Sequence, residues 1–404
     1  MSSRDQVTTT ATQARSTSAR IIGLDVARGL AVFGMFAAHT VPGTWLYTLA
    51  SGRAAALFAV LAGVSIALLS GGTDPFEGPR LKRARLRIAI RAVLLFALGL
   101  ALTSLHVPAM VILAFYGVLF LISTALLRLR ATTLMVFATV LAIVGPVLSF
   151  FLRKGIQTNL IGYHPDFSAF SSAEGMWTLL HGLLLTGAYP VLTWLPFLLA
   201  GMAVGRLDLH AVRGQLVRIG AALAVLGYGA SWLAMNAFGA LAHLKSTLPP
   251  GVPPEVLDVV LESNYGAVPT TDPVWLLTAG AHSGTSFEII GATGVALAVI
   301  GICVWADRLR VLLTPLSSVG ALALTAYVGH LLALKAIGPE QLASMAAQHP
   351  YLPWLALVAG TAVFAIVWRR LLGRGPLEWL LHKASTWPAQ RVATQGLSSS
   401  RGAR

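Results

Sequence analysis

The chain has 404 residues, of which 56% are hydrophobic and 11% charged, and its formal net charge is +14. A typical soluble domain carries about 25% charged residues, so this composition excludes an ordinary soluble protein. The mean hydropathy of +0.75 predicts a polytopic membrane protein. No segment between the apolar runs is long enough to form a basic soluble module, so no nucleic acid partner is expected.

Apolar runs of about 20 residues, the length that spans a bilayer as a helix, recur along the chain. Because a backbone in lipid must satisfy its own hydrogen bonds, all of these runs should be helices. The sequence therefore predicts an all-α, polytopic membrane bundle of ten or eleven transmembrane helices. The ten candidate spans lie near residues 21–41, 54–71, 88–106, 109–127, 131–151, 188–205, 217–239, 285–305, 314–337 and 351–368. Spans three and four are separated only by Ser104 to Pro108, and fusing them would invert everything that follows.

The two ends of the chain are polar and low in complexity. Residues 1–20 and 386–404 are predicted to be disordered and cytoplasmic. The segment between them, 21–385, is predicted to be one membrane domain with a front half, 21–210, and a C-terminal half, 211–385.

The basic residues test the number of spans. With the N-terminus inside, 23 basic residues fall in cytoplasmic segments and five outside, as the positive-inside rule requires. This distribution predicts a multi-pass protein of the plasma (inner) membrane with both termini cytoplasmic. The basic stretch from Arg80 to Arg91 is expected to be a topology anchor in a solvated loop, or else to attract a nucleotide-bearing cofactor.

The first span carries three ionisable residues, Asp25, Arg28 and His39. At about 100° per residue they lie within about 40° of one helix face, and at about 1.5 Å per residue they extend over roughly 21 Å. Ionisable groups at membrane depth usually face a bundle interior or a wet cavity, so this helix is expected to form the wall of a site. The alternative is an ion pair of Asp25 with Arg28 near the surface and a His39 side chain that only reaches the headgroups.

Two segments predicted to lie outside, 152–187 and 240–284, are too long to be simple turns and are expected to roof a site. The first contains Met176 to Thr186, predicted to be an interfacial or re-entrant helix, and two histidines expected to be loop or interface residues, His164 and His181. The second ends in AGAHSGTSFEIIG, where His282 precedes good helix-start residues and Glu288 lies about one turn into the span. Capping explains the neighbouring serine and threonine, but not a carboxylate inside the membrane.

Span nine places His330 in its outer half, so His39, His282 and His330 should lie at similar depth. No HExxH-type spacing is present, and no metal is expected. General acid and base chemistry suits histidines better, with Glu288 orienting one of them. The single cysteine, Cys303, lies inside span eight, which excludes an intramolecular disulfide.

The string GLDVARGLAVFGMFAAH resembles the first helix of membrane acyltransferases related to heparan-alpha-glucosaminide N-acetyltransferase. Asp25, Arg28 and Gly29 occupy its LDxxRG positions. Further strings resemble DUF418, a large bacterial family of uncharacterised multi-spanning proteins that shares this front half; they are SGRAAALFAVLAGVS, YPVLTWLPFLLAGMAVGRLDL, AHSGTSFEIIG, ALALTAYVGH and GRGPLEWL. The resemblance runs from about Arg20 to Trp379. It implies a helical bundle that takes an acyl group from cytoplasmic acyl-CoA and passes it to an acceptor across the membrane.

The active histidine of the lysosomal enzyme lies in the loop after the first span, and here the nearest equivalent by position is His39, at the end of the span. The resemblance thus implies an acyltransferase, either an O- or an N-acetyltransferase, that uses acetyl-CoA and acts on an extracytoplasmic sugar, lipid or cell-wall precursor. His39 and His282 are the candidate catalytic residues. The candidate binding residues are Asp25, Arg28, Arg53, Glu288 and His330.

The alternative function is a transporter or lipid flippase in which the same charges line a polar pathway. No inverted repeat or pair of broken helices is evident in the sequence to favour it. The partners expected are membrane lipids, acyl-CoA as donor substrate and the extracytoplasmic acceptor, with a homodimer left open.

Overall fold

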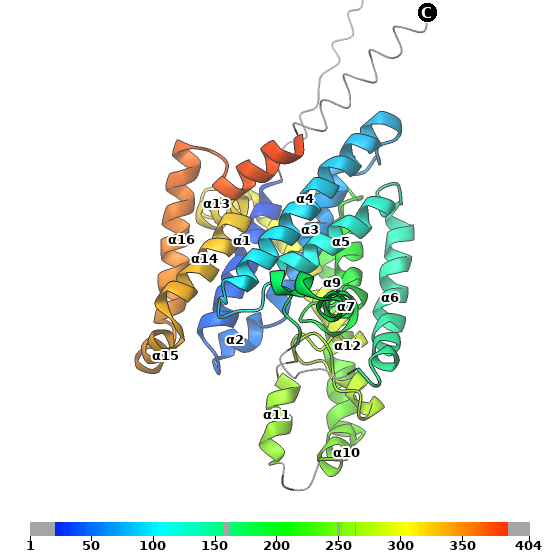
Figure 1. Cartoon of the computed structure of the whole chain (residues 1–404). Helices are drawn as coiled ribbons and strands as arrows, with labels where there is room; N and C mark the ends of the chain where they lie inside the picture. Colours follow the sequence, from blue (N-terminus) through cyan, green and yellow to red (C-terminus); the bar gives the residue numbers. More distant parts are fainter. Residues whose placement is uncertain (1–20, 157–161, 249–250, 252, 263, 387–404) are drawn as a thin grey trace, which may run out of the picture.

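The computed structural model describes residues 21–156, 162–248, 251, 253–262 and 264–386. The predicted disordered ends, 1–20 and 386–404, lie outside these residues apart from Thr386. The described part of the chain is 77% helix and contains no β-strand, which confirms the all-α class (Figure 1).

Seven helices, several with a short helical extension, are long and apolar enough to cross a membrane, and a bent pair would make an eighth. The remaining two predicted spans are shorter apolar helices, α5 (Leu113–Leu126) and α8 (Val191–Val204). The seven are α1 (Ile22–Thr40), α2 with α3 (Trp45–Ala50 and Arg53–Leu69), α4 (Gly78–Ser104), α6 (Ala131–Leu152), α9 (Leu209–Trp232), α12 (Ser286–Trp305) and α16 (Leu352–Leu371).

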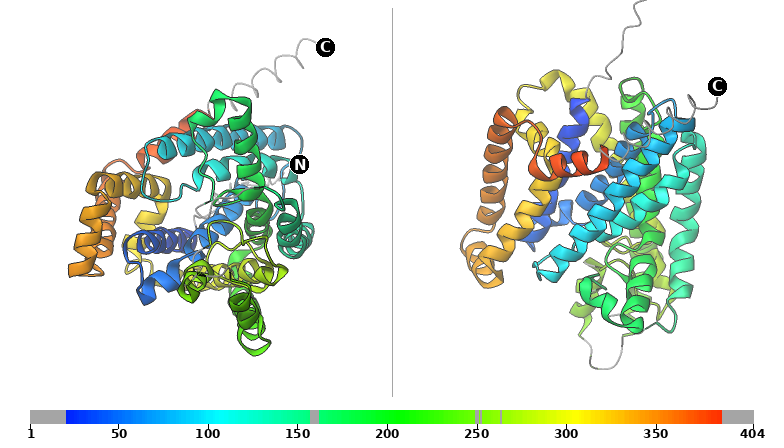
Figure 2. Two further views of the ribbon diagram at one scale, coloured as in Figure 1. Left: turned by 60° about the horizontal axis from the view of Figure 1, so that its bottom comes forward. Right: turned by 45° about the horizontal axis from the view of Figure 1, so that its top comes forward.

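The bundle has two different ends (Figures 1 and 2). The end at which α1 begins also holds the start of α4 and a C-terminal helix over residues 376–386, and we call it the terminal end. The opposite end, the loop end, holds α2 and most of the short elements. These are η1 (Phe167–Ser171), α7 (Ala173–His181), η2 (Gly182–Thr186), η3 (Leu233–Ala237), α10 (Ala240–Ser246), α11 (Pro254–Glu262), η4 (Pro273–Leu277) and α15 (Pro339–Gln348).

The third and fourth spans are separate helices. Gly99 of α4 packs against Ala114 of α5, and Gly117 of α5 packs against Phe96 and Ala92 of α4, so the pair is antiparallel. The order of crossings predicted from the sequence is therefore retained. One detail of the prediction is wrong: the basic stretch from Arg80 to Arg91 is not a loop but the first turns of α4.

The ninth span is broken. α13 (Thr314–Ala321) and α14 (Ala323–Ile337) meet at Leu322 with a bend of 85°. Close packing accompanies the break, because a side chain at Gly320 would collide with the Asp25 carbonyl and one at Gly29 with the Leu316 carbonyl. Two glycines thus let the backbones of α1 and α13 touch, as small residues do between membrane helices.

The segments predicted to roof a site do cover the loop end. The helix expected over Met176 to Thr186 begins earlier, at Ala173, and continues through a π-helical turn to Thr186. His181 bonds Thr186 Oγ1 through Nδ1 at 2.9 Å. His181 therefore has a local structural role, as expected for a loop histidine.

Candidate functional site

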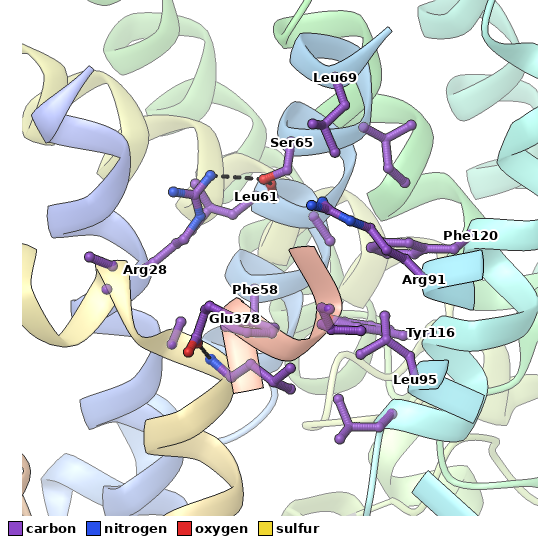
Figure 3. A pocket seen from close by; sticks show the side chains of 18 of the residues that line it. Arg28, Phe58, Leu61, Ser65, Leu69, Arg91, Leu95, Tyr116, Phe120 and Glu378 are labelled. Carbon is purple, nitrogen blue, oxygen red and sulfur yellow. Dashed lines mark hydrogen bonds between the residues drawn. The ribbon is translucent and has the colours of Figure 1, made fainter. Parts of the chain in front are cut away.

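A cavity of about 270 Å³ opens between α1, α3, α4, α5 and the C-terminal helix in the terminal half of the bundle. Figure 3 shows its lining, in which Arg28, Arg91 and Glu378 are the charged side chains labelled. Most of the remaining wall is apolar or aromatic, with Phe58, Tyr116 and Phe120. We call it the donor-side cavity; it is a mainly apolar pocket with a few charged side chains in its lining.

Asp25 and Arg28 lie at this cavity, as the polar face of the first span predicts. Arg28 Nη1 donates to Asp25 Oδ1 at 2.7 Å, and Nη2 donates to Ser65 Oγ at 2.8 Å. Asp25 is 4% exposed. The ion pair of Asp25 with Arg28, expected as the alternative to a site, is thus present. The pair also lines the cavity, and Arg28 links α1 to α3.

Cations gather where the donor-side cavity approaches the terminal end. A neighbouring cavity of about 360 Å³ shares Leu69 with it and is lined by Arg80, Arg83 and Arg87. His382 of the C-terminal helix lies among the same cations: burial first, and then the positive charges of Arg374, Arg87 and Arg91, lower its pKa. Like charges held together in this way favour binding of a polyanion, because a bound anion relieves their mutual repulsion. We call Arg80, Arg83, Arg87, Arg91, Arg374 and His382 the cation cluster.

Glu378 explains the break in the ninth span. Its Oε1 accepts hydrogen bonds from the backbone amides of Leu324 and Thr325 at 2.8 and 3.0 Å, and its Oε2 accepts one from Thr325 Oγ1 at 2.6 Å. A helix start leaves backbone N–H groups without intrahelical partners, so this carboxylate caps α14 inside the bundle. Gly375 leaves the room for it, since a side chain there would collide with the Glu378 carboxylate.

At the loop end, His39 and His282 line one small cavity together with Tyr189 and Tyr327. Its volume is about 20 Å³, which is about the space of one water molecule. Two histidines that are 243 positions apart in the chain therefore converge on one point. We call it the histidine cavity.

His330 completes this group from α14. His39 Nδ1 and His330 Nε2 lie 3.1 Å apart, and their rings stack with centroids 5.3 Å apart. His330 is 2% exposed and also packs against Phe36 and Tyr327. With Nδ1 of His39 as the donor, Nε2 of His39 keeps the lone pair that a general base needs.

His282 has an unusual backbone. Its φ is +58°, in the left-handed region that non-glycine residues seldom adopt, although histidine is among the more tolerant of them. The imidazole packs edge-on against Tyr189 and stacks on Trp194, and its Nδ1 is buried without a hydrogen-bond partner. Burial, with a smaller effect of His39, lowers the pKa of His282 to about 4, so it is neutral at pH 7. Local backbone strain of this kind concentrates at functional sites.

An aromatic layer separates the two cavities. Phe58 stacks on Tyr116 at 6.0 Å and on Tyr327 at 6.5 Å between ring centroids. Tyr116 lines the donor-side cavity, whereas Tyr327 lines the histidine cavity. The Tyr327 hydroxyl accepts from the Ile112 amide at 3.3 Å, but the Tyr116 hydroxyl is buried with no partner among the described residues. We call Phe58, Tyr116 and Tyr327 the aromatic partition.

Arg53 and Glu288 do not line the histidine cavity. The Arg53 guanidinium lies over the Tyr228 ring at 4.6 Å and close enough to Glu288 for an electrostatic interaction. Thr285 Oγ1 accepts from the Glu288 amide at 3.2 Å, which is half of a capping box. Glu288 is 2% exposed, and its carboxylate lies beside the backbone amides of Gly284 and His282, so within the described residues it faces the backbone and does not hold a histidine ring as expected.

Sequence reasoning missed several residues of this arrangement. The sequence predicts an anchor for the arginines of α4, and it gives Glu378 no role beyond its place in the string GRGPLEWL. Tyr116 carries no pattern of its own. A cap pattern, TSFE at 285–288, was visible and would have explained the position of Glu288. Within the described residues, no three His, Cys, Asp or Glu side chains could hold a metal ion.

A family model described as a protein of unknown function, DUF418, matches residues 260–388. The matched region runs from the end of α11 through the C-terminal helix and includes His282, Glu288, His330 and Glu378. The likeness to DUF418 expected from the sequence is therefore confirmed over this region. The front half, which carries LDxxRG, lies outside the match, and no curated protein matches the chain.

Proposed function

We propose that this membrane protein is an acyltransferase, which takes an acyl group from acyl-CoA at the terminal end and transfers it to a hydroxyl or amine at the loop end. One observation carries the proposal. A single helix, α1, connects a cavity bordered by cations with a histidine pair, the half-buried His39 and the buried His330. Arg28 and His39 are eleven residues apart, about 16 Å along the helix axis.

The donor would bind at the terminal end. The phosphates of coenzyme A suit the cation cluster, because guanidinium groups bind phosphate oxygens through paired, charge-assisted hydrogen bonds. The narrow apolar cavity beyond it suits the extended pantetheine arm, with Arg28 and Ser65 along its wall. By the positive-inside rule this end faces the cytoplasm, where acyl-CoA is found, and the membrane would be the plasma membrane.

The reaction would take place at the aromatic partition. His39 Nε2 accepts the proton of the acceptor hydroxyl or amine, and the acceptor atom forms a bond with the thioester carbonyl carbon. The carbon–sulfur bond then breaks, and His39 returns the proton to the departing CoA thiolate. His330 fixes the tautomer and orientation of His39 through the 3.1 Å hydrogen bond.

Tyr116 is placed to assist this step. Its hydroxyl is buried without a partner beside the path between the cavities, and a thioester carbonyl there would supply an acceptor. A preorganised donor of this kind stabilises the negative charge that develops on the carbonyl oxygen. The stacked rings of the aromatic partition lie between the two cavities, so in this proposal they move apart for the acyl group to reach His39.

A transporter remains the second candidate function, and two observations favour it. Glu288 is a buried carboxylate in the first turn of a predicted span, and buried carboxylates at membrane depth are typical of carriers that move protons. The broken span at Leu322 also resembles the discontinuous helices of transporters. Glu378 already occupies the amides of α14, however, so that helix start is not open to a substrate.

The test is release of free CoA. Purified full-length protein in lipid nanodiscs is incubated with acetyl-CoA and a panel of sugars, lipid-linked sugars and amines, and the thiol is titrated. Acceptor-dependent release supports the acyltransferase. Saturable uptake of substrate into proteoliposomes without release of CoA contradicts it and favours the transporter.

A further inference from the structure

A third cavity lies at the loop end, with a volume of about 450 Å³, within the range of about 300 to 1,000 Å³ found for small-molecule sites. Its polar lining comes from three places in the chain: Thr103 at the end of α4, His106 in the following loop, and His164 with Asp166 in the segment before η1. Val107, Ala109 and Met110 supply its apolar wall.

This cavity adjoins the histidine cavity. Met110 lines both of them, and the Tyr189 hydroxyl, which belongs to the histidine cavity, donates to the Met110 carbonyl at 3.5 Å. Met110 thus forms part of the wall between a molecule held in the larger cavity and the cavity of His39 and His282. The histidine cavity itself has room for about one water molecule, so an acceptor must be held outside it.

The two cavities also share an unusual backbone feature. His106 has φ +54° and His282 has φ +58°, and these are the only non-glycine residues with positive φ in the described part of the chain. Each places its imidazole at one of the two adjoining cavities. Strained residues persist where the surrounding structure over-determines them, which is typical of binding and catalytic sites.

The charge of the lining identifies the kind of ligand. No lysine or arginine is among the described residues that line this cavity, in contrast with the cation cluster. One oxygen of its single carboxylate is engaged locally, because Asp166 Oδ1 accepts from the Ser168 amide at 2.9 Å and the Ser168 hydroxyl at 2.6 Å. Imidazole, carboxylate and hydroxyl groups beside an apolar wall match the mixed donors and acceptors of an uncharged, hydroxyl-rich molecule. Lys335, whose ammonium donates to the Leu105 carbonyl next to His106, is bound to the backbone and is not part of the lining, so a phosphorylated molecule would meet Asp166 without a cation in the lining to compensate.

We propose that this cavity binds the acyl acceptor and that the acceptor presents an uncharged sugar or polyol group. One hydroxyl of that group passes the Met110 segment to reach His39, while the others stay hydrogen-bonded to His106, His164 and Asp166. This assignment rests on the proposed acyl transfer, but binding itself needs neither acyl-CoA nor turnover.

Saturation-transfer difference NMR tests the site on the full chain in lipid nanodiscs without acyl-CoA. The probe is methyl α-D-glucopyranoside, and glucose 6-phosphate is the charged comparison. We expect saturation transfer to the neutral sugar and an affinity at least about tenfold lower for the phosphate. The double variant His106→Asn, Asp166→Asn should weaken binding of the neutral sugar by about tenfold or more, the effect of losing hydrogen bonds to one ligand.

The variants preserve the local structure. Asparagine tolerates a left-handed backbone at position 106 and caps η1 at position 166 as aspartate does. His349→Asn, which alters an exposed histidine outside this cavity, is the matched control and should bind like the wild type. Equal binding of sugar and sugar phosphate, or unchanged binding by the double variant, overturns the proposal. Sugar binding lost in the double variant, in a protein that never releases CoA, upholds the site and rejects acyl transfer instead.

Discussion

The two ends of the bundle differ in the charge of the residues that line their cavities. At the terminal end, arginines from α4 and the Arg374 loop approach one another and His382 with little acid among them. At the loop end, the histidine cavity and the cavity beside it are lined by imidazoles, phenols and one carboxylate, Asp166, and by no lysine or arginine among the described residues. This difference favours binding of a polyanion at the terminal end and of an uncharged acceptor at the loop end.

Among the substitutions that test this comparison, His39→Ala is expected to have the largest effect. His39→Ala removes the general base at the point where the two paths meet, so turnover should fall by about 10²- to 10⁴-fold while acyl-CoA binding is nearly unchanged. CoA release and equilibrium binding of acyl-CoA are the measurements. His243→Ala, at an exposed histidine bonded to Asp272, is the control. Wild-type turnover in His39→Ala would return His39 to a purely interfacial role.

Tyr116→Phe tests whether the aromatic partition takes part in the chemistry. Removing the hydroxyl leaves the stacked rings in place, and turnover should fall by about 10²-fold through loss of a donor to the developing oxyanion. The KM for acyl-CoA should stay within about twofold, because the interaction strengthens in the transition state. A rise in KM with unchanged kcat would show that Tyr116 acts only in binding. Tyr228→Phe, outside both cavities, is the control.

Arg87→Ala tests the terminal end. Arg87 belongs to the cation cluster, and its loss should raise the KM for acyl-CoA by about tenfold, the effect of one charge-assisted hydrogen bond to phosphate. Dephospho-CoA thioesters should be less sensitive, since they carry less negative charge. Arg213→Ala is the control, because Arg213 lies near the start of α9, outside the cation cluster, and bonds the His210 carbonyl of its own helix. Equal effects of the two substitutions would contradict a phosphate site.

The last test concerns how the free energy of unfolding depends on pH. The pKa of His282 is about 4 in the folded protein and 6.5 ordinarily, so the unfolded chain binds more protons between these values. The contribution of His282 to stability should therefore be constant above about pH 7 and fall by up to about 3 kcal/mol as the pH drops to about 4. Thermal unfolding in detergent as a function of pH measures it. His282→Asn keeps the left-handed backbone and should flatten the profile; an unchanged profile would mean that other groups cause it.

The spans could be predicted because hydrocarbon length and hydrogen-bond satisfaction leave few choices for a long apolar run. The polar face of α1 could be predicted for the same reason, since helical periodicity places Asp25, Arg28 and His39 on one side. The 85° bend could not, because the carboxylate that stabilises it belongs to Glu378, more than fifty positions away. Convergence of His39, His282 and His330 likewise depends on how three distant helices pack.

The Glu378 cap has a mechanical consequence. The C-terminal helix carries His382 into the cation cluster and also binds α14 through three hydrogen bonds. Tyr327 and His330 lie along the same rigid α14, one and two turns beyond the cap. A shift of the C-terminal helix must either break those hydrogen bonds or pull α14 with it. Ligand binding at the cation cluster, beside the donor-side cavity, is thus mechanically coupled, through the C-terminal helix and α14, to Tyr327 and His330 at the histidine cavity.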